Sequence, residues 1–194
     1  MIKGSEMRRA DYAVDKLFID RWSPRAMSGE ELSEPELMAL FEAARWAPSS
    51  NNNQPWRILY ARRSGKHWPV FFDLLGDSNK RWADKAAALL VFISKKTFDN
   101  GKPSITHSYD TGAAWVSLAL QGVLKGYVVH GMQGFNYERA REILKIPEEF
   151  NVEAMAAVGK PGNLADLPED IQKRETPNAR RPVQDSVREG SFGF

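Results

Sequence analysis

Two short stretches of the sequence carry most of the side chains suited to binding a polar ligand. The first is Arg21-x-Ser23-x-Arg25, which places two guanidinium groups and a hydroxyl near the end of a predicted helix. A guanidinium group binds phosphate through a planar fork of donors and keeps its charge, so this pattern suits a phosphorylated ligand. Cations are also common at helix carboxyl ends, so a solvated surface turn has the same composition. The pattern alone leaves both interpretations open.

The second stretch is residues 48–56, Pro-Ser-Ser-Asn-Asn-Asn-Gln-Pro-Trp, in which six consecutive side chains form hydrogen bonds. Ser and Asn are common in a loop that joins a helix to a strand, because their side chains bond to the turning backbone. The same set of donors and acceptors suits a ligand with many polar edges. We weigh these two interpretations equally.

Other common catalytic motifs are missing from the chain. There is no Gly-rich phosphate loop, no Gly-x-Ser-x-Gly elbow and no His-Glu-x-x-His pair. The three histidines, His67, His107 and His130, lie far apart in the sequence. We therefore expect no metal site and no histidine-based triad.

Composition places the chain among globular proteins of one large domain. It has 194 residues, of which 42% are hydrophobic, and a net charge of +2 with both signs interspersed, so nucleic acid is not an expected partner. The absence of cysteine fits a reducing compartment. No stretch resembles a signal peptide or approaches the roughly 18 apolar residues of a membrane span. We expect a cytoplasmic protein that contacts no membrane.

Hydrophobic periodicity predicts an alternation of strands and helices. Ser33 and Glu36 have capping-box spacing and predict where one helix begins, while Pro48 predicts where it stops. A loop or short helix is expected within residues 71–85. The predicted helices are 7–21, 33 to about 48, 109–125 and 137–144, and the predicted strands are 56–62, 86–93, 127–130 and 152–159.

Two segments indicate a second chain. Residues 109–125 are nearly apolar on every side, as expected for a buried helix, and such a helix often lies at a subunit interface. Residues 163–194 carry many charges and prolines and too few apolar side chains for a core of their own. This tail is either disordered or an arm that packs on another surface.

Taken together, these motifs resemble the FMN-dependent nitroreductases. That family has an Arg-x-Ser-x-Arg/Lys signature, a Pro-Ser-Ser-x-Asn-x-Gln-Pro-Trp block and an Arg close to a Pro near its end, which match Arg21 to Arg25, residues 48–56 and Arg180-Arg181-Pro182. Asp110-x-Gly112 and Gly134-Phe135 also match in order and spacing. The resemblance implies an α+β fold with a central, mostly antiparallel sheet flanked by helices, formed as one domain over 1–194. It also implies a homodimer in which residues 163–194 form an arm on the partner chain.

The resemblance assigns roles around an FMN cofactor. Arg21 and Ser23 would hold the phosphate and ribityl region, and Arg25 would approach the pyrimidine edge of the ring. Arg180 would complete the phosphate clamp, with the adjacent Arg181 as the alternative for that role. Trp22 and Asn178 replace residues that are often polar or basic in relatives, which predicts a lighter clamp. The partner chain would contribute Ser49, Ser50 and Asn52 to the same flavin. Asn79 would lie near the pyrimidine ring, and backbone groups of Gln133 and Gly134 would face N5.

In such an enzyme the flavin carries the chemistry at N5, and no protein side chain is expected to be catalytic. NADH or NADPH would deliver hydride, and a nitroaromatic, quinone or similar small acceptor would collect it from the same cleft in a ping-pong reaction. Residues 97–107 are either a lid or a surface loop. Alternatives are a flavin-cleaving or reductive dehalogenating enzyme on this scaffold, a non-catalytic flavin-binding dimer, and a cofactor-free interaction domain.

Overall fold

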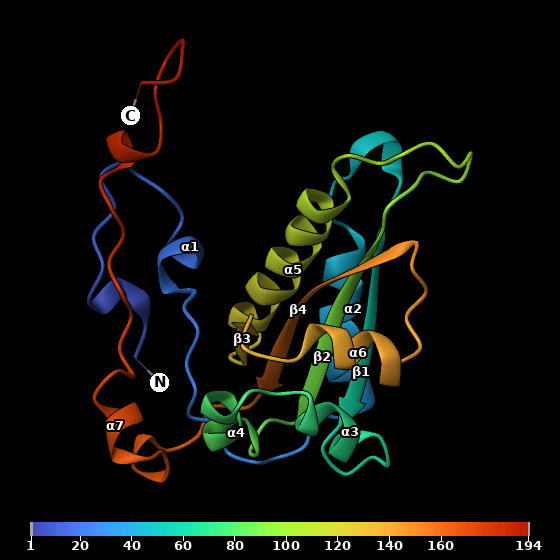
Figure 1. Cartoon of the computed structure of the whole chain (residues 1–194). Helices are drawn as coiled ribbons and strands as arrows, with labels where there is room; N and C mark the ends of the chain where they lie inside the picture. Colours follow the sequence, from blue (N-terminus) through green and yellow to red (C-terminus); the bar gives the residue numbers. More distant parts are fainter. Residues whose placement is uncertain (1, 194) are drawn as a thin grey trace.

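The computed structural model describes residues 2–193 and has a four-stranded antiparallel sheet at its centre (Figure 1). The strands are β1 (Trp56–Arg62), β2 (Ala88–Lys95), β3 (Val128–Met132) and β4 (Phe150–Gly159), in the order β1-β2-β4-β3. Every neighbouring pair is antiparallel, with a register shift in β2 between Phe92 and Ile93. All four predicted strands are confirmed, and β1 has the predicted bounds.

Alternate residues of β2 enter two different cores, because successive side chains of a strand point to opposite faces of a sheet. Leu90 and Phe92 pack in the core under α2 (Glu34–Arg45) and α5 (His107–Leu124). Leu89 and Val91 pack in the core on the other face. Three short helices contribute to that second core: α3 (Trp68–Asp73), α4 (Asp77–Ala83) and α6 (Tyr137–Ile143). The α+β prediction, an antiparallel sheet flanked by helices, is confirmed.

The start of α2 is determined locally. The Ser33 side chain accepts the backbone N–H of Glu36, and the Glu36 carboxylate accepts the backbone N–H of Ser33. This reciprocal capping box satisfies two helix-end donors and confirms the predicted start. The long apolar helix is confirmed as α5, and its tight packing on β3 depends on Gly122, where an added Cβ would lie 2.6 Å from Cγ2 of Val129.

The predicted helix over residues 7–21 is wrong. Within that range only α1 (Lys16–Asp20) is helical, and a short 3-10 turn, η1 (Gly4–Glu6), lies before it. The Asp15 side chain accepts the backbone N–H of Leu17 and so caps a helix that begins at Lys16. The apolar stripe that favoured a longer helix has no core to enter within this chain: Val14 is 48% exposed and Phe18 57%.

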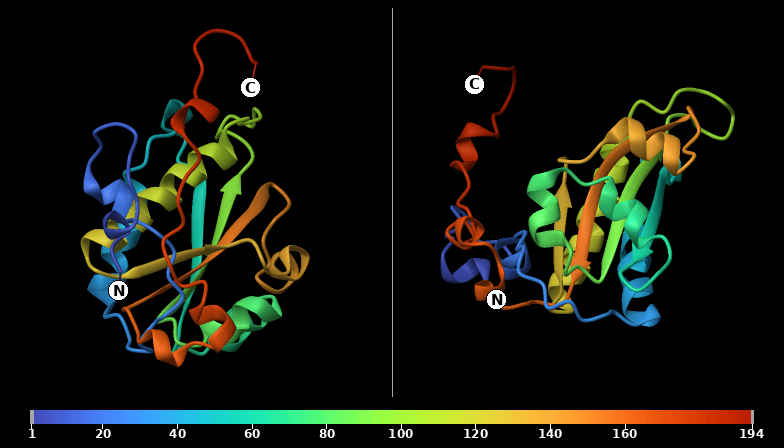
Figure 2. Two further views of the ribbon diagram at one scale, coloured as in Figure 1. Left: turned by 90° about the vertical axis from the view of Figure 1, so that its left-hand side faces the viewer. Right: turned by 60° about the horizontal axis from the view of Figure 1, so that its bottom comes forward.

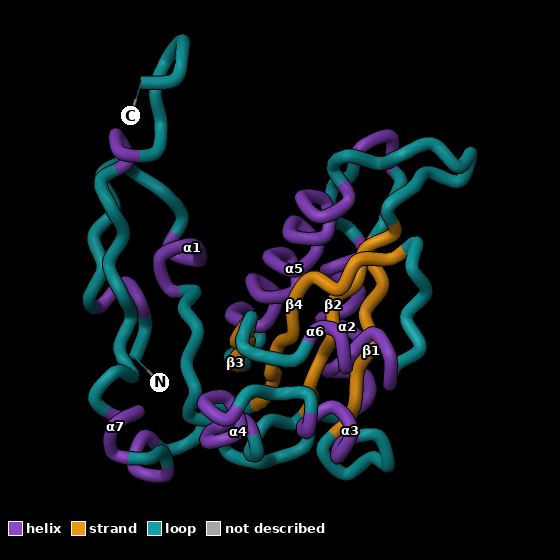
Figure 3. The backbone as a smooth tube through the Cα atoms, in the orientation of Figure 1, coloured by secondary structure: helices purple, strands orange, loops and turns teal. Residues whose placement is uncertain are grey.

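The two ends of the chain run side by side along one flank of the molecule (Figures 1 and 2). Nε of Arg8 donates to the Asn178 carbonyl at 2.7 Å, and the Val183 backbone N–H donates to Asp11 at 2.9 Å. Both ends consist mostly of loop (Figure 3). The short helical elements of this part and of the loop before β1 are η2 (Ser50–Asn52), η3 (Leu164–Asp166), α7 (Glu169–Gln172) and η4 (Val183–Asp185).

The expected arm divides into two parts. Leu167 and Ile171 are buried in the core of their own chain, so residues up to about Glu175 pack on their own domain. Residues 178–193 are almost all exposed. Residue 194, the last of the expected arm, and residue 1 lie outside the described residues. Over 2–193, the helices are all too short or too polar to cross a membrane.

Candidate functional site

Three guanidinium groups gather where the two ends of the chain meet. Nη1 of Arg8 donates to the carbonyls of Ile19 and Arg21, at 3.0 and 2.8 Å, while Nε of Arg8 donates to Asn178. Nη1 of Arg180 donates to the same Asn178 carbonyl at 3.3 Å. Carbonyl oxygens thus hold Arg8 and Arg180 beside Arg21 without neutralising them.

Burial and mutual repulsion act on this cluster. The pKa of Arg21 is lowered by burial and then by the charges of Arg180 and Arg8, and the pKa of Arg8 is lowered by burial and by Arg180. Within residues 2–193 none of the three forms an ion pair with a carboxylate. Like charges held together without a counterion favour the binding of an anion. Of the two neighbouring arginines in the tail, Arg180 is the one whose charge lowers the pKa of Arg8 and of Arg21.

The predicted Arg21-x-Ser23-x-Arg25 segment is a loop that follows α1. Arg21 ends α1 with an extended backbone, and Pro24 disfavours a helical conformation at Ser23. Nη1 of Arg21 donates to Oγ of Ser23 at 3.4 Å, so these two side chains lie on the same side. Trp22, which lies between these two residues in the sequence, is buried, and its Nε1 donates to the carbonyl of Ile2 at 2.9 Å. Trp22 therefore anchors the first residues of the chain, which accounts for an aromatic residue at this position of the motif.

His130 connects this segment to the next group of predicted residues. The His130 ring lies 4.5 Å from that of Trp82, on α4, and its Nδ1 is 2.8 Å from the Pro24 carbonyl. Burial, with smaller contributions from Arg25 and Arg21, lowers the pKa of His130 to about 4, so the ring is neutral at pH 7. A neutral ring on the edge strand β3 thus links α4 to the arginine segment.

Asn79 and Gly134 lie together, as the prediction of a shared ligand requires. Nδ2 of Asn79 donates to the Gly134 carbonyl at 3.0 Å, and the backbone N–H of Gly76 donates to the same oxygen at 2.9 Å. An added Cβ at Gly134 would lie 3.0 Å from Nδ2 of Asn79 and would press on that side chain. Gln133 precedes it and is exposed.

The Ser- and Asn-rich block lies at the other end of α5. The backbone N–H of Ser50 donates to the carboxylate of Asp110, in the first turn of α5, whereas Trp22 and Pro24 line a pocket with residues near the end of that helix. An 18-residue helix is about 27 Å long. The structure therefore does not bring Ser49, Ser50 and Asn52 to Arg21 within one chain.

The block itself is held in an unusual conformation. Asn51, Asn52 and Gln54 all have positive φ angles, at 49°, 54° and 47°. Asn adopts this region more readily than most residues, but three such residues within four positions indicate strain that the surroundings maintain. The Ser49 hydroxyl accepts the backbone N–H of Gln54 at 3.0 Å and helps to hold the turn.

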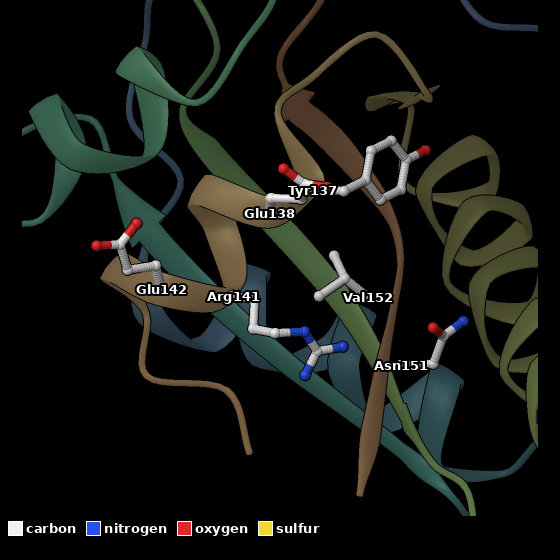
Figure 4. Close-up of a pocket in the computed structure, with 6 residues that line it drawn as sticks. All are labelled: Tyr137, Glu138, Arg141, Glu142, Asn151 and Val152. Carbon is white, nitrogen blue, oxygen red and sulfur yellow. The ribbon is translucent and has the colours of Figure 1, made fainter. Parts of the chain in front are cut away.

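A separate pocket lies between α6 and the start of β4 (Figure 4). Arg141 points into this region, but its guanidinium donates to the carbonyls of Ile146, Pro147 and Phe150. Arg141 therefore closes the turn before β4 and is already occupied. None of the predicted site residues lines this pocket.

The sequence prediction missed two residues of the site. Arg8 joins Arg21 and Arg180, and Glu175 accepts the backbone N–H groups of Arg25 and Ala26. Neither belongs to a recognisable motif, and Glu175 is 150 residues from Arg25. Over residues 2–193, no group of His, Cys, Asp and Glu suited to a metal ion is present.

Comparisons with known proteins identify the family of this chain. The model of the nitroreductase family matches residues 19–85. The chain is similar to a crystal structure described as an oxidoreductase containing FMN, with 46% identity, 96% of each chain covered and a TM-score of 0.92.

More distant relatives were also found. A putative nitroreductase in complex with FMN from Desulfovibrio desulfuricans shares the fold, with 20% identity, 92% of this chain and 96% of that chain covered and a TM-score of 0.72. An uncharacterised 15.4 kDa protein of Mycolicibacterium smegmatis is 29% identical over 148 residues, which are 71% of this chain and 97% of that protein. Because the strongest of these likenesses spans nearly the whole of both chains, and the family model includes the Arg21 to Arg25 segment and the block at 48–56, the chain belongs to the nitroreductase family.

Proposed function

We propose that this chain, an FMN-dependent NAD(P)H oxidoreductase, passes hydride by a ping-pong mechanism to a small acceptor such as a nitroaromatic or quinone. Bound FMN would supply the chemistry, accepting hydride from NADH or NADPH and delivering it to the acceptor. The protein would bind and orient the cofactor, place charge beside it and leave one face of the ring open. A cytoplasmic location, which the absence of cysteine fits, is part of this proposal.

The observation that carries the proposal is the convergence of Arg8, Arg21 and Arg180 without a carboxylate partner within residues 2–193. A phosphate group is a suitable counterion for guanidinium groups, which bind it through parallel charge-assisted hydrogen bonds. Ser23 adds a hydroxyl next to Arg21. The residues present therefore fit the phosphate end of FMN, and Arg8 supplies the cation that Asn178 lacks.

The ring end of the cofactor is assigned to residues farther along the same side. Arg25 would lie at the pyrimidine edge, Asn79 close to it, and Gln133 and Gly134 near N5. The link from Pro24 through His130 to α4 supports this assignment, because it ties the arginine segment to the helix that carries Asn79. These roles follow from the family resemblance, and each can be tested by substitution of the residue.

The remaining predicted contacts would come from a second copy of the chain. The residue 48–56 loop, with Ser49, Ser50 and Asn52, lies one helix length from Arg21. A single chain therefore cannot bring this loop and the Arg21 segment into contact with the same FMN. Large apolar side chains stay exposed on both α5 and α1, including Tyr109 in the first turn of α5, which is 81% exposed, and Phe18 of α1. Exposed apolar surface of this kind is typical of an interface. A homodimer with FMN between the subunits accounts for both features.

Anaerobic spectroscopy tests the proposal. The purified protein should be yellow or become yellow with added FMN, and NADH or NADPH should bleach the flavin absorbance under anaerobic conditions. Addition of a quinone or nitroaromatic should then restore it. A bound flavin that neither nicotinamide bleaches would favour a storage or sensing dimer. A colourless monomer that takes up no FMN would contradict the proposal.

A further inference from the structure

Glu175 is a buried carboxylate in a part of the chain where charged residues are otherwise exposed. Its exposed fraction is 5%, whereas Arg174 and Lys173 beside it are exposed. Oε1 of Glu175 accepts the backbone N–H groups of Arg25 and Ala26, the latter at 2.9 Å. Oε2 lies 3.4 Å from Nη1 of Arg25. Within residues 2–193, the hydrogen-bond and ion-pair partners of this carboxylate therefore all belong to Arg25 and Ala26.

Such a contact has a specific physical effect. A charged carboxylate is costly to bury unless hydrogen bonds and an opposite charge compensate it, and Arg25 and Ala26 supply both. The two backbone bonds fix the position of the chain at Arg25 and Ala26 relative to Glu175. The ion pair restricts the guanidinium and offsets part of its positive charge. The guanidinium keeps some contact with solvent, since its side chain is 27% exposed.

We propose that Glu175 is a positioning residue of the cofactor site that acts through Arg25 and lowers the redox potential of bound FMN. This inference rests on the proposed function, which places Arg25 beside the flavin ring. There, Arg25 would stabilise the negative charge that the ring gains with two electrons and one proton, the equivalent of the hydride from the nicotinamide. Glu175 offsets part of that stabilisation, so the pair sets how readily the enzyme accepts hydride and how strongly it reduces its acceptor.

The Glu175→Gln variant separates charge from structure, because Gln retains an oxygen that accepts the two backbone N–H groups and loses the negative charge. FMN-loaded wild type and variant are reduced anaerobically together with a reference dye to measure the midpoint potential. We expect the variant to shift to a more positive potential, with a ratio of affinities for reduced over oxidised FMN higher by on the order of tenfold. For a two-electron couple this ratio corresponds to about 30 mV. Affinity for oxidised FMN should change by much less than the reduced-form affinity.

Two further variants control this result. Glu169→Gln removes the same charge from an 85% exposed side chain of the same tail and should leave the potential unchanged. Arg25→Gln should shift the potential to a more negative value. In the Arg25→Gln background, Glu175→Gln should have a smaller effect than in the wild type. Equal shifts in both backgrounds would mean that Glu175 acts by its own field, which would overturn the positioning role.

The outcomes also separate this inference from the proposed function. A wild-type protein that binds no FMN contradicts the proposed function itself. A flavin-loaded Glu175→Gln variant with an unchanged or more negative potential overturns only the role of Glu175. Should Glu175→Gln fail to fold, Arg25→Gln still tests the premise of the inference, because an unchanged potential in that variant would show that Arg25 is not at the ring and would overturn a role of Glu175 through it.

Discussion

Arg21 and Arg180 are 159 positions apart in the sequence, and their side chains act on the same small volume because the two ends of the chain run together. Arg8 completes the cluster by binding three backbone carbonyls from both ends. It therefore has two effects: it adds positive charge, and it joins the segment before Arg21 to the segment before Arg180. A phosphate bound here would relieve the repulsion among the three cations.

Substitution of the clamp arginines should weaken FMN binding. Arg21→Ala and Arg180→Ala each remove a charge-assisted contact worth about 1.5–3 kcal/mol, so the dissociation constant for FMN should rise by roughly 10- to 100-fold. Quenching of FMN fluorescence on titration with apoprotein measures it. Arg181→Ala is the matched control and should bind FMN like the wild type, because it is the charge of Arg180 that lowers the pKa of Arg8 and of Arg21. Full flavin retention by both Arg21→Ala and Arg180→Ala would disprove the assignment.

His130 should make stability depend on pH. The folded protein keeps His130 neutral down to a pKa of about 4, whereas the unfolded chain protonates near the ordinary pKa of 6.5. The unfolded state therefore binds more protons between these values, and the free energy of unfolding falls as the pH drops from about 6.5 to 4. Above this range, the neutral His130 contributes about 3 kcal/mol to the free energy of unfolding, and this contribution is lost once the pH is below 4.

Urea unfolding of the apoprotein at a series of pH values checks this prediction. The His130→Gln variant should lose less stability between pH 7 and pH 4.5 than the wild type, whatever its stability at pH 7. His67→Gln changes an exposed histidine and should keep the wild-type slope. Parallel curves for wild type and His130→Gln would show that His130 does not cause the dependence.

At the scale of the elements, α5 determines how far apart the two halves of the proposed site lie. One end of α5 binds the loop at residues 48–56 through Asp110, and the other end packs on β3 through Gly122. The inner face of α5 includes the buried residues Ala114, Leu118 and Ala119. The helix therefore acts as a rigid spacer, and its position on the sheet fixes where each group of ligand-binding residues lies.

Two glycines in α5 should respond oppositely to alanine. Gly122→Ala places a methyl group against Val129 and should destabilise the protein by about 1–3 kcal/mol. At Gly112 no described atom lies within 4 Å of the added Cβ, so Gly112→Ala should be neutral or stabilise by up to about 1 kcal/mol. Urea unfolding at one protein concentration measures both. Equal stability of Gly122→Ala and wild type would mean that α5 and β3 separate easily.

At the scale of the whole molecule, the tail after residue 163 has a buried part and an exposed part, and each part has its own role. Residues up to Pro177 contribute Leu167, Ile171 and Glu175 to their own domain. The exposed residues after Pro177 carry Arg180 and run beside the start of the chain. We expect this exposed part to meet the second subunit as well, since it has no core of its own.

Two truncations separate these roles. A chain ending at Pro182 retains Arg180 and the Asn178 carbonyl, and should retain FMN. A chain ending at Pro177 loses both and should purify with little or no flavin, while its domain core stays intact. Flavin absorbance per protein and sedimentation velocity measure cofactor content and oligomeric state. Full flavin in the shorter chain would show that the tail is not part of the clamp.

Local sequence determined much of the fold and the motifs of the site. The alternating pattern at β1 placed that strand within its observed bounds, and the Ser33–Glu36 capping box placed the start of α2, because both signals act over a few residues. The Arg21 and residue 48–56 motifs were recognisable for the same reason: their spacing is short. Only helix 7–21 was wrongly predicted among the helices, because its apolar stripe has no core in this chain.

Tertiary structure decided which distant groups meet. Arg8 and Glu175 belong to no motif, and their contacts with Arg21, Asn178 and Arg25 arise only when the chain ends fold back along one flank. The same folding puts Ser50 a helix length away from Arg21, so that a second subunit is needed to complete the proposed site. Sequence spacing predicts which side chains share a helix face or a turn, but charges and carbonyls 150 residues apart come together only through packing of the whole chain.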